Sequence, residues 1–67
     1  MWIARDKSGD LYLYKNEPVR MESFFTSRYV GEDYDQIDDK DLIDIDSSKI
    51  TWENGPVFID SNSIKDA

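Results

Sequence analysis

The residues best suited to chemistry gather in one acidic stretch, GEDYDQIDDKDLIDID, at positions 31–46. Eight of its sixteen residues are Asp or Glu, and one, Lys40, is basic. The rest of the chain has equal numbers of acidic and basic residues, so this stretch accounts for the whole net charge of −7. Carboxylates at this density can bind hard cations, attract basic partners or imitate the phosphates of nucleic acid. They can also form a solvated edge whose charge prevents strand pairing.

The spacing of the acidic residues does not match a metal-binding loop. The segment DYDQIDDKD has no glycine where such a loop must turn. A second segment, DKSGDLYLYKNE at 6–17, places acidic residues and a serine at EF-hand positions, but Leu11 stands where that loop requires glycine. We therefore expect neither a metal nor a cofactor.

The composition also argues against an enzyme. The chain has no histidine and no cysteine, which removes the commonest general base and both the Ser-His and the Cys-His nucleophile pairs. Paired carboxylates can hydrolyse glycosides, but 67 residues are too few to build a deep sugar cleft. No phosphate-binding or nucleophile motif is present. We expect a non-enzymatic protein.

Aromatic residues make up 13% of the chain and supply material for a core. Most rings should be buried, because so small a domain has little else to bury. Two tyrosines of the segment LYLYK share one strand face and are the best candidates for an exposed patch. With five acidic residues they make up our candidate partner-binding set: Asp33, Asp35, Asp38, Asp39, Asp41, Tyr12 and Tyr14.

Short runs of β-branched and aromatic residues alternate with turn signals every 8 to 12 residues. This pattern predicts an all-β fold, a small antiparallel barrel-like or half-barrel sheet of four to six short strands. The first hairpin should cover residues 1–15, with its turn at 6–10. The strand at 11–15 has apolar or aromatic residues on both faces, which is typical of a central strand. Further short strands are expected at 19–22 and within 23–29.

The second half of the chain is less regular. The alternation at 43–46 predicts a strand with Ile43 and Ile45 inward, while a short helix over 38–43 is the alternative. A last hairpin is expected at 50–59 around Asn54-Gly55. Its connection should be longer than two residues or bulged, because Pro56 has no N–H to donate across the turn.

These elements predict one domain over residues 1–60 and a frayed tail over 61–67. The expected core consists of Trp2 or Ile3, Leu11, Leu13, Ile43, Ile45, Ile50, Trp52, Val57 and Ile59.

No apolar run approaches the roughly 20 residues that span a bilayer. The first ten residues lack the pattern of a signal peptide. We expect a cytoplasmic protein without a membrane partner. An acidic surface also repels the phosphates of nucleic acid, so direct nucleic-acid binding is not expected.

Two segments, MWIARDKSGDLYLYKNEP and IDSSKITWENGPVFI, carry a resemblance. They resemble a group of short uncharacterised proteins from bacterial and phage genomes. Those proteins open with an aromatic residue followed by I-A-R-D-x-x-G-x-L-Y-L-Y and close with T-W-E-N-x-P. The resemblance covers about half the chain and leaves out the acidic middle. It implies a β-rich cytosolic protein of phage or mobile-element origin, and it offers no functional residues to transfer.

Three functions fit these observations. The first is a non-enzymatic protein-interaction module whose partner is an unknown, basic protein. The second is an acidic mimic of DNA that inhibits a nucleic-acid-binding host protein, whose binding should weaken steeply with salt. The third is a structural or self-assembling protein.

Overall fold

The computed structural model describes residues 1–65, and these form an all-β fold with six strands in two antiparallel sheets. The larger sheet has the order β5-β2-β1-β6 and does not close into a barrel, while β3 and β4 form a separate hairpin. The predicted half-barrel class is therefore confirmed. The strands are β1 (Trp2–Arg5), β2 (Leu11–Tyr14), β3 (Val19–Arg20), β4 (Phe25–Thr26), β5 (Tyr34–Ile37) and β6 (Val57–Phe58), and the 3₁₀ helices are η1 (Asp39–Asp41), η2 (Ser47–Lys49) and η3 (Ser61–Ser63).

The first hairpin has the predicted position. β1 and β2 pair antiparallel, with Trp2 opposite Tyr14 and Arg5 opposite Leu11. The turn is closed by the amide of Asp6, which donates to the carbonyl of Asp10 at 2.8 Å. As predicted, β2 is central, because it lies between β1 and β5.

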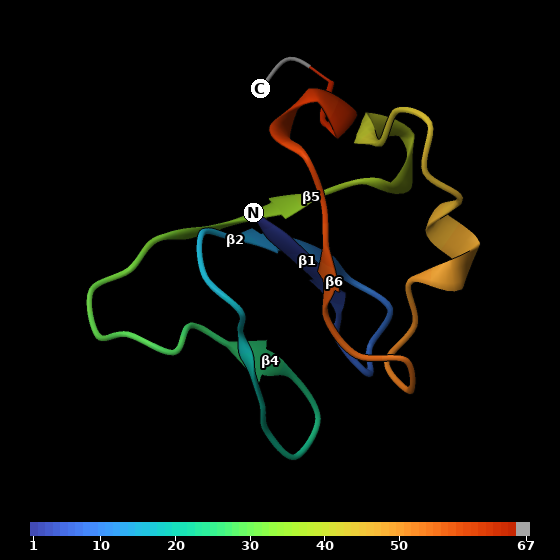
Figure 1. The fold of residues 1–67 in the computed structure, drawn as a ribbon. Coiled ribbons are helices and arrows are strands. Elements are labelled where there is room, and N and C mark those ends of the chain that lie inside the picture. Colours follow the sequence, from blue (N-terminus) through green and yellow to red (C-terminus); the bar gives the residue numbers. More distant parts are fainter. Residues whose placement is uncertain (66–67) are drawn as a thin grey trace.

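The larger sheet lies between the helical turns on one side and the β3–β4 hairpin on the other (Figure 1), and it separates two apolar clusters. On one face, buried isoleucines from distant segments pack against Ile3 and Leu11 beneath the helical turns. On the other face, Phe25 of the β3–β4 hairpin packs over Ala4 and Tyr14. The alternation of a strand sends neighbouring residues to opposite faces, so this short sheet is covered on both sides.

The acidic stretch forms its strand earlier than the alternation predicted. Tyr34–Ile37 pairs with β2, with Tyr34 opposite Tyr14 and Ile37 opposite Leu11. The strand predicted at 43–46 is wrong: this segment is a series of bends, and Asp44 has φ +61. A residue at this φ breaks an extended ladder. The alternative helix at 38–43 is partly confirmed as the single turn η1, with Asp38 as its N-cap.

The hairpin predicted at 50–59 is wrong. Val57 and Phe58 do form a strand, but it pairs with β1, placing Phe58 opposite Trp2. Residues 51–55 form a tight turn instead, in which the amide of Gly55 donates to the carbonyl of Thr51 at 3.2 Å. Pro56 lacks the N–H that a two-residue hairpin needs, and Val57–Phe58 instead pairs with the side of β1 that β2 leaves free.

The prediction of a frayed tail is wrong for residues 61–65. Ser61–Ser63 forms η3, and Ile64 is 8% exposed and bridges to Leu42. The amide of Lys65 also donates to the carbonyl of Asp41 at 2.7 Å. Burial of the apolar side chain of Ile64 holds the otherwise polar segment 61–65 against the rest of the fold. Residues 66 and 67 of the predicted tail lie outside the described residues.

The predicted core is largely confirmed. Ile3, Leu11, Ile50 and Ile59 are buried, and Leu13, Ile45 and Val57 pack half-buried against them. The prediction that Ile43 belongs to the core is wrong, because Ile43 is 41% exposed in the bends after η1. Trp52 is half-buried and packs at the second cluster. The sequence analysis did not identify four residues of the buried apolar core: Ala4, Tyr14, Phe25 and Ile64.

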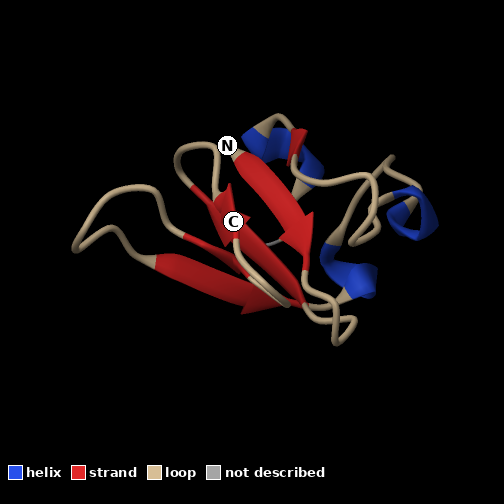
Figure 2. Cartoon of the chain, turned by 90° about the horizontal axis from the view of Figure 1, so that it is seen from below, coloured by secondary structure: helices blue, strands red, loops and turns tan. Residues whose placement is uncertain are grey.

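β5 lies along the outer edge of the larger sheet, with no strand beyond it among residues 1–65 (Figure 2). No helix in this part of the chain is long and apolar enough to cross a membrane.

Candidate functional site

Seven of the eight acidic residues of 32–46 fall into two groups, and the eighth, Asp38, is the N-cap of η1. Four of them accept hydrogen bonds within the chain and so help to hold the fold: Glu32, Asp39, Asp41 and Asp46. The carboxylates of three others, Asp33, Asp35 and Asp44, accept no hydrogen bond from residues 1–65. The acidic stretch is therefore only partly available to a partner.

Asp39 belongs to the centre of a polar network rather than to a free surface. The guanidinium of Arg5 donates to its carboxylate at 3.0 and 3.3 Å, and the Ser47 hydroxyl donates at 2.8 Å. Arg5 also donates to the carbonyls of Gly9, Ser47 and Ile50 at 2.7, 3.1 and 2.7 Å. These bonds lower the pKa of Asp39 below its usual value, with the Arg5 hydrogen bond as the largest cause. Our candidate Asp39 is thus a structural residue.

Two further carboxylates fasten loops. Glu32 accepts from the side-chain amide of Asn16 at 2.6 Å and from the Ser27 hydroxyl at 3.0 Å, and the Asn16 side-chain bond is the main reason that its pKa is lowered. Asp46 accepts from the backbone amide and the hydroxyl of Ser48, which lower its pKa and cap η2. Each carboxylate supplies the acceptor that an exposed turn needs.

η1 uses two of our candidate residues. The backbone amide of Asp38 donates to the carboxylate of Asp41 at 3.0 Å, the arrangement of a capping box. Asp41 is half-buried, and Asp38 is exposed. Asp41 therefore holds the turn and still reaches the surface described next.

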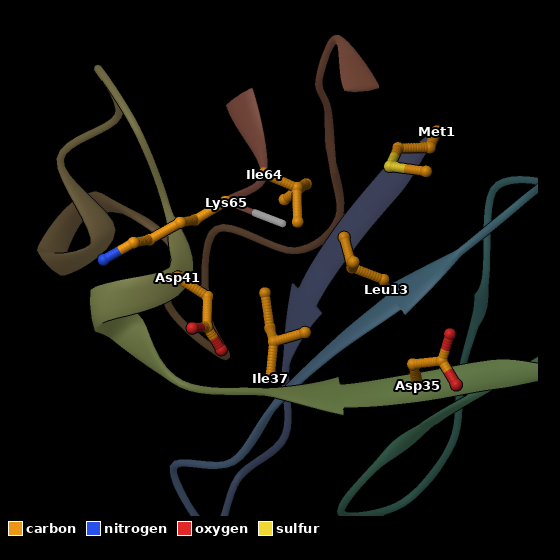
Figure 3. A pocket seen from close by; sticks show the side chains of 7 residues that line it. All are labelled: Met1, Leu13, Asp35, Ile37, Asp41, Ile64 and Lys65. Atoms are coloured by element: carbon orange, nitrogen blue, oxygen red, sulfur yellow. The ribbon is translucent and has the colours of Figure 1, made fainter. Parts of the chain in front are cut away.

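An open hollow of about 430 Å³ lies between the start of β1, the two strands β2 and β5, and the C-terminal segment. Figure 3 shows Ile37 between the carboxylates of Asp35 and Asp41, with Leu13 above it in this view and the Lys65 side chain extending past Asp41. Its apolar lining comes from Met1, Leu13, Ile37 and Ile64, and its polar rim from Asp35, Asp41 and Lys65. We call these seven residues the acid-rimmed hollow.

The strand register places Asp35 at this hollow. Asp35 lies opposite Leu13, and Ile37 lies opposite Leu11. All four therefore share the face of the sheet that carries the larger apolar cluster, the main core, which contains Ile3 and Leu11. Asp35 is exposed, whereas Leu13 and Ile37 are half-buried. An apolar floor with carboxylates at both ends suits a side chain with an aliphatic stem and a cationic end.

The two candidate tyrosines lie on the opposite face. Tyr14 is 2% exposed, so the expected exposed patch is wrong for this residue. Its hydroxyl donates to the carbonyl of Phe25 at 3.1 Å, and burial raises its pKa. Tyr12 is half-buried, and its pKa is raised by its burial and by the carboxylates of Asp10 and Asp6.

The aromatic residue that the sequence analysis missed on this face is Tyr34. Its ring stacks on Tyr14 at 5.3 Å, meets Tyr12 edge-on at 5.7 Å and is 48% exposed. Alternation could not have found it, because Tyr34 and Ile37 are three positions apart and fall on opposite faces of the strand. The local signal was one aromatic and one β-branched residue, both strand formers, within the acidic stretch. The structure thus brings Asp35 and Asp41 together and places the tyrosines on the other side of the sheet.

No group of three or more acidic side chains in residues 1–65 is arranged to hold a metal ion. A comparison with protein-family models found no match, and comparisons with curated proteins and with solved structures found none either.

Proposed function

We propose that this chain is a non-enzymatic, cytoplasmic protein-interaction module that binds a basic segment of a partner protein at the acid-rimmed hollow. Its resemblance to small phage and bacterial proteins supports an origin in a mobile element. The observation that carries the proposal is the position of Asp35, an exposed carboxylate beside the apolar surface of Leu13 and Ile37.

The chemistry of the hollow favours a basic side chain. The stem of a lysine or arginine can cover Leu13 and Ile37 while its charged end meets Asp35 or Asp41. Opposite charges across an interface raise the association rate and select the partner more than they raise affinity. The net charge of −7 extends this attraction over the whole molecule.

A test compares two single substitutions with the same change of charge. Asp35→Asn removes the free carboxylate at the hollow, whereas Asp44→Asn removes a carboxylate outside it. Asparagine also suits the φ of +61 at position 44, so both variants should fold. Each chain is used as bait in bacterial lysate, and the captured basic protein is then purified and its binding constant measured.

We expect Asp35→Asn to weaken binding about tenfold or more, since tenfold is near the lower end of the range for a close charge pair, and Asp44→Asn to leave it nearly unchanged. Equal binding by both variants, or no captured partner, contradicts the proposal. A mimic of DNA would lose affinity with each carboxylate in turn and would depend steeply on salt.

A further inference from the structure

The outer edge of β5 is the most accessible backbone of the larger sheet. β5 pairs with β2 on one side over all four of its residues, and no strand of residues 1–65 pairs with its other side. Tyr34, Asp35 and Gln36 are all exposed. An edge strand presents unpaired N–H and C=O groups that can accept a further strand.

The two faces of β5 differ in chemistry. Asp35 and Ile37 face the acid-rimmed hollow, and Tyr34 and Gln36 face the tyrosines of β2. A strand added beside β5 would therefore meet a carboxylate on one face and an aromatic ring, 48% exposed, on the other. Directly opposed side chains across two strands lie about 4.5–5.5 Å apart, which is close enough for an ion pair or ring contact.

We infer that the edge of β5 binds an extended segment of the partner by strand addition, with lysine or arginine at alternate positions and apolar or aromatic residues between them. This inference rests on the proposed function and specifies its binding mode. The basic side chains would lie beside Asp35 at the rim of the hollow, and the intervening residues would pack against Tyr34. Main-chain hydrogen bonds supply affinity in this mode, and the alternating side chains supply specificity.

The charge near β5 decides between the possible occupants. Asp33 and Asp38 flank the strand, and both are exposed. Two copies of β5 placed edge to edge would bring these carboxylates and Asp35 toward their counterparts, which is unfavourable. The same carboxylates attract a basic strand, so the occupant is a basic partner segment rather than a second copy of this chain.

A synthetic peptide can test the strand addition directly. The probe is an octapeptide with blocked ends, lysine at every second position and valine or tyrosine between. Two further peptides carry N-methyl groups on one or the other alternate set of residues. A strand uses the N–H groups of only one such set toward a given neighbour, so only one N-methylated peptide should lose binding, by about tenfold or more. Amide NMR of the full chain should show shifts and slowed hydrogen exchange along β5.

A chain variant provides the matched control for charge. The Asp35→Lys variant should no longer bind the lysine peptide and should bind the same peptide with glutamate in place of lysine. The Asp44→Lys variant should still prefer the lysine peptide. This exchange of preference requires a folded chain, so it separates lost contact from lost structure.

Several results would overturn the inference. If both N-methylated peptides bind like the parent, no backbone pairing occurs, although an Asp35-dependent lysate partner would leave the proposed function intact. If no peptide binds at millimolar concentration while that partner still binds, strand addition is refuted and the proposed function stands. A dimer that forms through β5 without peptide would show that the occupant is a second copy.

Discussion

Arg5 ties four separate segments together, and its replacement should destabilise the fold strongly. Arg5→Met keeps most of the aliphatic stem but removes every guanidinium hydrogen bond. The bonds to the carbonyls of Ile50 and Ser47, at 2.7 and 3.1 Å, are partly buried and contribute about 1–1.5 kcal/mol each. The Asp39 carboxylate is 55% exposed, so that solvent-screened ion pair adds at most about 1 kcal/mol.

The expected total is therefore a loss of about 3 kcal/mol in the free energy of unfolding. A domain of this size has roughly 3–10 kcal/mol in all, so the melting temperature should fall by more than about 10 °C. The assay is urea unfolding followed by the fluorescence of the two tryptophans. The control is Arg28→Met, because the nitrogen of Arg28 lies 4.0 Å from Glu17 and both side chains are about half exposed. That change should cost less than about 0.5 kcal/mol. A loss below about 1 kcal/mol for Arg5→Met, or equal losses for both variants, would refute the assignment of Arg5 as the central tie.

Three further outcomes are expected. Ile64→Ala should cost about 2–4 kcal/mol in urea unfolding, because Ile64 is 8% exposed in the main core; an unchanged midpoint would mean that the C-terminal segment does not dock. The raised pKa of Tyr14 contributes stability that is present below the unfolded pKa of about 10 and is lost as the pH rises above it; absorbance at 295 nm should show one tyrosine that ionises only on unfolding, and Tyr14→Phe should abolish that step. The lowered pKa of Asp39 contributes stability that is present above the unfolded pKa, near 4, and is lost as the pH falls through the folded value; Asp39→Asn should flatten this acid limb, and an unaltered limb would assign it to other carboxylates.

Local signals in the chain were enough to predict the first hairpin and the all-β class. The segment LYLYK combines strong strand formers, and the turn before it contains Gly9 with φ +102, a conformation suited to glycine. Both faces of β2 carry apolar or aromatic residues, so its central place also followed from local pattern. These features depend on neighbours in the sequence, and a short window of residues contains them.

The position of β5 depended on tertiary structure. Ile43 and Ile45 alternate more cleanly than the residues of YDQI, yet the chain pairs YDQI with β2. β5 is an edge strand, so polar and charged side chains on it stay in solvent and do not destabilise the sheet. The same side chains weaken the alternation of apolar and polar residues by which a strand is predicted from sequence. The partner of β6 was predicted wrongly because that partner, β1, lies more than fifty residues away in the sequence. A local pattern instead favours pairing β6 with the nearer segment 50–52.

The sequence by itself determined the composition of the candidate site: an acidic stretch of eight carboxylates, without histidine or cysteine. Only the tertiary structure decided which carboxylates are free. Arg5 is distant from Asp39 in sequence, and it binds Asp39 because β1 and η1 meet in the fold. Asp35 stays free because the register of β5 points it toward the hollow. Charge is a property of the residue type, but its availability depends on hydrogen bonds between segments that the sequence places far apart.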